Sequence, residues 1–183
     1  MRTADADILL VPGLGGSGPD HWQSRWAAKL PTSRIVAQDD FDRPDLAAWR
    51  ARLVEAVHAA SRPVVLVAHS VGALAVAHSA EALKGLPVAG AFLVAPPSPE
   101  AVAALPAVDA AFAADPLEKT PFPTLVVASR NDVYSRYEDA ERLANTIGAE
   151  LVDAGESGHI NVDSGHGPWP EGLMRFAGFL KKL

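Results

Sequence analysis

The sequence contains no cysteine, and this absence excludes disulfide bonds, thiolate metal sites and a cysteine nucleophile. It also lacks any apolar run near the roughly 18 residues that a membrane-spanning helix needs, so no membrane partner is expected. The segment before the first apolar run carries Asp5 and Asp7 and is unlike a secretory signal peptide. We therefore expect a cytoplasmic protein.

An excess of basic residues is missing as well. The chain has 16 Lys and Arg against 22 Asp and Glu, a formal net charge of −6 with both signs interspersed, which argues against a nucleic-acid partner. Hydrophobic residues make up 49% and charged residues 21%, the balance of a soluble globular protein. We expect residues 1–183 to form one domain with a substantial core. The sequence leaves the oligomeric state open.

Short apolar runs alternate with segments of helical periodicity along the chain. The runs are continuous, which is typical of parallel strands buried on both faces. The sequence therefore predicts a doubly wound, three-layer α/β domain with a mostly parallel sheet of about six strands. The predicted strands cover residues 8–11, 35–37, 64–68, 91–95, 125–129 and 150–152, and the predicted helices cover residues 19–30, 44–60, 71–84, 135–147 and 170–180.

The segment 98–123 has the weakest pattern, with short helices predicted at 99–104 and 107–114. Ser135 and Glu138 have the spacing of a capping box, which predicts the start of a helix. In a doubly wound sheet, sites lie beyond the carboxyl ends of the strands. The residues that follow each predicted strand are therefore the candidates for function.

The run 64–68 ends at a His-Ser pair, and a helical segment follows at once. A strand, a tight turn with one exposed serine and a helix make up the nucleophile elbow, usually written G-x-S-x-G. Here Ser70 is the serine, Gly72 is the second glycine and Ala68 replaces the first. Small residues are needed at both places because strand and helix backbones pass close together. A serine after a strand is also a common helix N-cap, so the motif needs partners.

Two further strand ends supply those partners. Asp132 follows strand 125–129 and His159 follows strand 150–152, which gives the order Ser…Asp…His found in α/β-hydrolases. A serine hydroxyl is a weak nucleophile that needs a base, and an imidazole can take its proton and return it to the leaving group. A carboxylate on the far ring nitrogen fixes the tautomer. We predict Ser70 as nucleophile, His159 as base and Asp132 as the group that orients it.

Other interpretations of these residues stay open at this point. Asp132 could instead cap helix 135–147 or serve in a turn. His166, in a Gly-His-Gly sequence, is a rival base, and either histidine could be an ordinary loop residue. The co-occurrence of all three residues at strand ends favours the triad.

An acyl-transfer site also needs donors for the developing oxyanion, normally two backbone N–H groups. One belongs to the residue after the nucleophile, Val71. The other comes from the glycine-rich loop after the first strand, and Leu14 is the best placed candidate. We predict Leu14 and Val71 as the oxyanion hole.

The same loop contains a competing motif. Gly13, Gly15 and Gly18 match G-x-G-x-x-G between a strand and a helix, and Asp39 ends the next strand, which together form a dinucleotide-binding fingerprint. This alternative would make the protein a nicotinamide or flavin oxidoreductase. Pro19 directly after the third glycine, the short chain and the unexplained serine elbow argue against it.

Metal binding is not expected either. His58 and His78 lie on predicted helices without a paired carboxylate at ligand spacing. We therefore predict neither a metal nor an organic cofactor.

Sequence segments along nearly the whole chain resemble the small α/β-hydrolases grouped with retinoblastoma-binding protein 9 and its bacterial serine hydrolase relatives. The resemblance rests on residues 11–26, the serine elbow, residues 93–97, residues 121–132 and residues 158–172. It implies an α/β-hydrolase fold without a lid domain, and it implies that Ser70, Asp132 and His159 are the catalytic triad. The retinoblastoma-pocket motif of the animal protein needs a cysteine, so that partnership is not expected here.

We therefore expect a serine hydrolase that cleaves small ester or amide substrates through an acyl-enzyme. A protein with a hydrolase fold whose function is binding, with little turnover, is the alternative, because fold and triad do not guarantee activity.

Overall fold

The computed structural model describes residues 1–116 and 118–183. Residue 117, which belongs to the weakly patterned segment 98–123, lies outside the described residues. The centre of the protein is a six-stranded sheet in the order β2-β1-β3-β4-β5-β6, and every strand pair of the described sheet is parallel. This confirms the predicted α/β class and strand count. The strands are β1 (Asp7–Val11), β2 (Ser33–Ile35), β3 (Val64–His69), β4 (Val88–Val94), β5 (Thr124–Ala128) and β6 (Glu150–Asp153).

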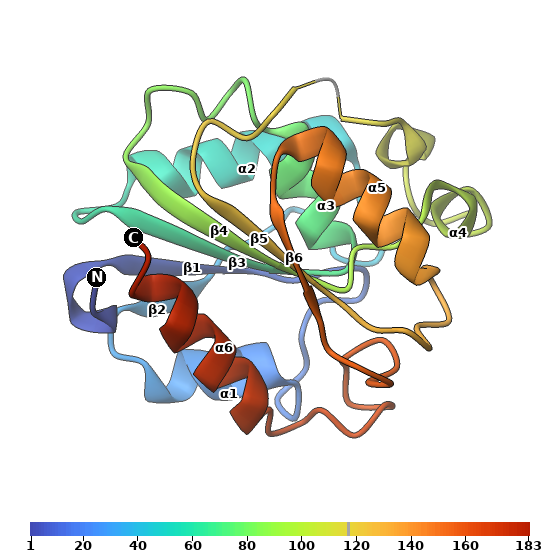
Figure 1. Ribbon diagram of the computed structural model, residues 1–183. Coiled ribbons are helices and arrows are strands. Elements are labelled where there is room, and N and C mark those ends of the chain that lie inside the picture. Colours follow the sequence, from blue (N-terminus) through green and yellow to red (C-terminus); the bar gives the residue numbers. More distant parts are fainter. Residues whose placement is uncertain (117) are drawn as a thin grey trace.

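Helices cover both faces of the sheet, as Figure 1 shows, with α2, α3 and α5 on one face and α1 and α6 on the other. One buried cluster joins the first face to aliphatic strand residues, and a second joins the other face to an aromatic group that includes Trp22, Trp26 and Phe176. The helices are α1 (Trp22–Lys29), α2 (Leu46–His58), α3 (Val71–His78), α4 (Pro99–Ala103), α5 (Tyr137–Ile147) and α6 (Pro170–Leu180), with 3₁₀ turns η1 (Thr3–Asp5) and η2 (Ala110–Ala113). None of the helices in the described part of the chain has the length and hydropathy of a membrane span.

Several predicted boundaries differ from the structure. The strand predicted at 35–37 is β2, two residues earlier, and helix 71–84 ends as a helix at His78. The predicted capping box is wrong: Arg136 is the N-cap of α5 and no side chain caps it, while the Ser135 hydroxyl donates to the Arg136 carbonyl. The periodicity located the element but not the side-chain hydrogen bond at its end.

The register of the sheet sets where the site forms. His69 on β3 lies beside Val94 on β4, Val94 beside Val127 on β5, and Val127 beside Val152 on β6. The strands therefore end nearly level, and the segments after β3, β5 and β6 leave the sheet at one edge. This is the edge at which parallel sheets carry their sites.

Candidate active site

Ser70 occupies a sharp turn between β3 and α3. Its backbone has φ 55° and ψ −129°, a conformation that an L-residue adopts only when the surroundings enforce it. The Ser70 N–H donates to the Val94 carbonyl at 3.0 Å. A Cβ at Gly72 would lie 2.3 Å from the carbonyl oxygen of Pro12, so only glycine lets α3 pass this close to the end of β1. The turn has the geometry of a nucleophile elbow.

Ala68 replaces the first glycine of the elbow motif without opening the turn. The residue is fully buried, lies in register between Val11 and Leu93, and packs in the aliphatic cluster beneath α2 and α3. The extra methyl group is part of the core.

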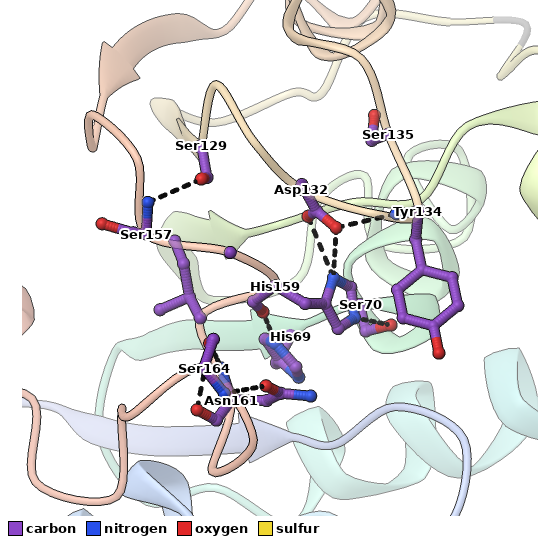
Figure 2. Close-up of polar contacts among 12 residues, drawn as sticks. His69, Ser70, Ser129, Asp132, Tyr134, Ser135, Ser157, His159, Asn161 and Ser164 are labelled. Carbon is purple, nitrogen blue, oxygen red and sulfur yellow. Dashed lines mark hydrogen bonds and ion pairs between the residues drawn. The ribbon is translucent and has the colours of Figure 1, made fainter.

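The structure brings the three predicted side chains together. His159 Nε2 lies 2.9 Å from Ser70 Oγ, and His159 Nδ1 lies 2.9 and 3.0 Å from the carboxylate oxygens of Asp132 (Figure 2). The His159 side chain is 8% exposed and that of Asp132 is 2% exposed. Asp132 also accepts a hydrogen bond from the Tyr134 N–H, so the turn predicted as an alternative role is formed as well. His166 instead contacts the Ser164 hydroxyl at 3.2 Å.

Two side chains that sequence reasoning missed tie the Asp132 loop to the His159 loop. Asn131 Oδ1 accepts from the Ser129 hydroxyl at 2.9 Å and from the Gly158 N–H at 2.7 Å. The Ser129 oxygen accepts from the Ser157 N–H at 2.9 Å. These bonds hold the carboxylate and the imidazole in one frame. The signal in the sequence was the polar run after strand β5, of which only the aspartate was assigned a role.

A second missed feature is a pair of buried histidines beside His159. The His69 ring lies 4.9 Å from the rings of both His159 and His21, centre to centre. His69 Nε2 donates to the His159 carbonyl at 2.9 Å, since a carbonyl only accepts. Burial, with the neighbouring histidines, holds the pKa of His69 well below its usual range, and burial and His159 lower the pKa of His21 to about 4. Both rings are therefore neutral near pH 7.

Because His21 and His69 have lowered pKa values, we expect the protein to lose stability in mild acid. An unfolded chain protonates its histidines near pH 6.5, whereas folded His21 takes up a proton only near pH 4. Between these values the unfolded state binds more protons, so the free energy of unfolding falls as the pH falls, by up to roughly 3 kcal/mol for His21. We expect Tm, measured from pH 7 to pH 4, to decline over this range. His21→Asn, which keeps an N-cap acceptor for α1, should flatten part of the decline; a Tm constant from pH 6.5 to 4.5 would contradict the expectation.

The two residues predicted to supply the oxyanion donors line the same cavity as Ser70. Leu14 and Val71 both line a cavity of about 180 Å³ above the serine, and among the described residues neither backbone N–H donates to a protein acceptor. The glycine-rich loop lies close to the serine, because a Cβ at Gly13 would be 2.8 Å from the Cβ of Ser70. The other residues lining the cavity are Gly16, His21, His69, Pro97, Leu105, Tyr134, His159 and Asn161.

The dinucleotide interpretation does not fit this arrangement. Helix α1 begins at Trp22, beyond the glycines, and its N-cap is the His21 side chain, which accepts from the Gln23 N–H. Asp39, the acidic residue of the fingerprint, forms an ion pair with Arg52. The glycine-rich loop packs on the serine elbow instead of forming the N-terminus of a helix.

Comparison with known proteins identifies the family to which the chain belongs. Residues 8–178 match the family model of serine hydrolases. The chain belongs to this family. The resemblance to bacterial serine hydrolases is thus confirmed, while the link to retinoblastoma-binding protein 9 stays a prediction. No curated protein matches the sequence.

Solved structures of similar proteins agree with the family. A YdeN-like hydrolase of Pectobacterium atrosepticum is 34% identical, with 97% of this chain and 91% of that chain covered and a TM-score of 0.83. The ydeN gene product of B. subtilis is 22% identical, with 95% and 98% covered and a TM-score of 0.73. Esterase 2 of Thermogutta terrifontis, 15% identical with 100% and 85% covered and a TM-score of 0.71, shares the α/β-hydrolase fold.

Proposed function

We propose that this serine hydrolase cleaves small ester or amide substrates through an acyl-enzyme formed on Ser70, with His159 as general base and Asp132 as its orienting carboxylate. The observation that carries the proposal is the chain of hydrogen bonds from Ser70 Oγ through His159 to the buried Asp132 carboxylate. Ser70 Oγ lies 2.9 Å from His159 Nε2. These contacts are within the reach that proton transfer to a base requires.

In the proposed reaction, Ser70 Oγ attacks the carbonyl carbon while its proton passes to His159 Nε2. The carbonyl oxygen becomes an oxyanion, which the N–H groups of Leu14 and Val71 stabilise. Collapse of the tetrahedral intermediate expels the alcohol or amine, which takes the proton from His159. A water molecule, deprotonated by His159, then attacks the acyl carbon, and the acid is released as His159 returns the proton to Ser70 Oγ. No cofactor is required at any step.

The size of the cavity supports small substrates. Its volume of about 180 Å³ is below the roughly 300–1,000 Å³ of pockets that hold drug-sized ligands. We expect turnover of short acyl esters to exceed that of long ones.

A fluorophosphonate probe tests the proposal, because it reacts covalently only with an activated serine. We expect the wild-type protein to be labelled and Ser70→Ala to lose the label. Ser33→Ala, a matched change at the start of edge strand β2, should label as the wild type does. A wild-type protein that takes no label would contradict the proposal and favour a binding role.

A further inference from the structure

The cavity above Ser70 has chemically different walls, and the general reaction leaves one of them unexplained. Apolar contacts come from Leu14, Val71, Pro97 and Leu105. A polar wall comes from His21, His69 and Asn161, none of which takes part in the proposed proton transfers.

His21 offers one fixed donor to this cavity. Its Nδ1 accepts from the Gln23 N–H at 3.2 Å, so in the neutral ring the proton is on Nε2. Among the described residues Nε2 has no hydrogen-bond partner. It is also not fully buried, because the fully buried side-chain atoms without a partner belong to Gln38 and His78. The Nε2–H of His21, a residue only 7% exposed, is therefore open to the cavity that the ring lines.

Asn161 offers a second fixed donor by the same logic. Its Oδ1 accepts from the Ser164 N–H at 3.1 Å, which orients the amide, and the Asn161 N–H in turn donates to the Ser164 hydroxyl. Figure 2 shows the amide nitrogen of Asn161 directed away from Ser164. That nitrogen has no partner among the described residues and is likewise not among the fully buried unpaired atoms.

The position of these polar residues indicates that they contact the leaving group of the substrate. His159 must return its proton to the departing alcohol or amine, so that part of the substrate lies against the His159 ring. The His69 and His21 rings continue from His159 at 4.9 Å intervals, and Asn161 follows His159 by two residues. Both donors are neutral, and no lysine or arginine lines the cavity among the described residues. The wall therefore suits an uncharged oxygen acceptor.

We propose that the preferred substrates carry a second, uncharged oxygen acceptor in the leaving group, an ether, hydroxyl or carbonyl oxygen, that binds His21 Nε2–H and Asn161 Nδ2–H. The substrate class is thus small esters or amides of oxygenated alcohols or amines. This inference rests on the proposed function.

The test compares 2-methoxyethyl acetate with n-butyl acetate, which have the same length and differ by one ether oxygen in place of a methylene. Their kcat/KM ratio is divided by the ratio of their hydroxide-catalysed rates to remove intrinsic reactivity. Two neutral hydrogen bonds contribute about 0.5–1.5 kcal/mol each, so we expect the corrected ratio to favour the ether by at least about fivefold. A corrected ratio near one would overturn the inference.

The variant Asn161→Asp is the more specific test. It keeps the Oδ1 acceptor for the Ser164 N–H and replaces the Nδ2–H donor by a carboxylate oxygen. We expect the corrected ratio to fall to one or below. Asn145→Asp, the same change on the exposed side of α5, should keep the wild-type ratio. His21→Phe is the second variant, should the first not fold, and it should lower the ratio too. A ratio unchanged in both would overturn the inference. If neither ester is hydrolysed in a Ser70-dependent way, the proposed function fails instead.

Discussion

Replacement of Ser70 by glycine is expected to abolish turnover and, compared with replacement by alanine, to raise thermal stability. The backbone at this position has φ 55° and ψ −129°, where an L-residue costs of order 1–3 kcal/mol and glycine does not. Alanine keeps this strain, while glycine relieves it against about 0.5–1 kcal/mol of extra entropy in the unfolded chain. Both variants lack the nucleophile, so kcat/KM should fall at least about 10³-fold.

The measurement is a pair of melting curves beside ester turnover. At roughly 2–4 °C per kcal/mol for a domain of this size, we expect Ser70→Gly to melt a few degrees above Ser70→Ala. At Ser33, in extended strand backbone, the order should reverse, with glycine less stable than alanine. Equal melting of the two Ser70 variants would contradict the strain, and retained turnover would contradict the nucleophile.

The elbow could be predicted from the sequence because its determinants are local. The nine positions 64–72 hold a run of buried strand residues, one serine and Gly72, which encode strand, turn and helix, and the close approach of Pro12 explains why glycine is needed. Asp132 and His159 could be placed because parallel strands end at one edge of the sheet, so position after a strand translates into position in space.

What the sequence did not show depends on contacts between distant segments. His21 is the N-cap of α1, and only the fold brings its ring to His69 and, through it, to His159. The choice between His159 and His166 depended on the family resemblance, because both lie in similar glycine-flanked loops. The Asn131 amide is likewise oriented by the backbone N–H of Gly158, 27 residues along the chain, a tertiary hydrogen bond that periodicity does not encode.

The frame around Asp132 makes its substitution informative. One carboxylate oxygen accepts from the Tyr134 N–H at 2.9 Å, and both face His159 Nδ1. In Asp132→Asn the amide oxygen is expected to keep the Tyr134 bond, which turns the NH₂ group toward the imidazole. Two donors cannot face each other, so His159 should shift its proton from Nδ1 to Nε2. The base would then present a proton to Ser70 instead of a lone pair.

We therefore expect Asp132→Asn to lower kcat about 10⁴-fold, with KM and Tm close to those of the wild type, because size and packing are unchanged. Fluorophosphonate labelling should slow by a similar factor, which separates loss of an activated serine from loss of substrate binding. Asp163→Asn, an exposed aspartate in the loop beyond His159, is the matched control and should retain activity. A kcat within tenfold of the wild type in Asp132→Asn would mean that this carboxylate does not set the tautomer, and Asp132 would then be only a turn residue that caps the Tyr134 N–H.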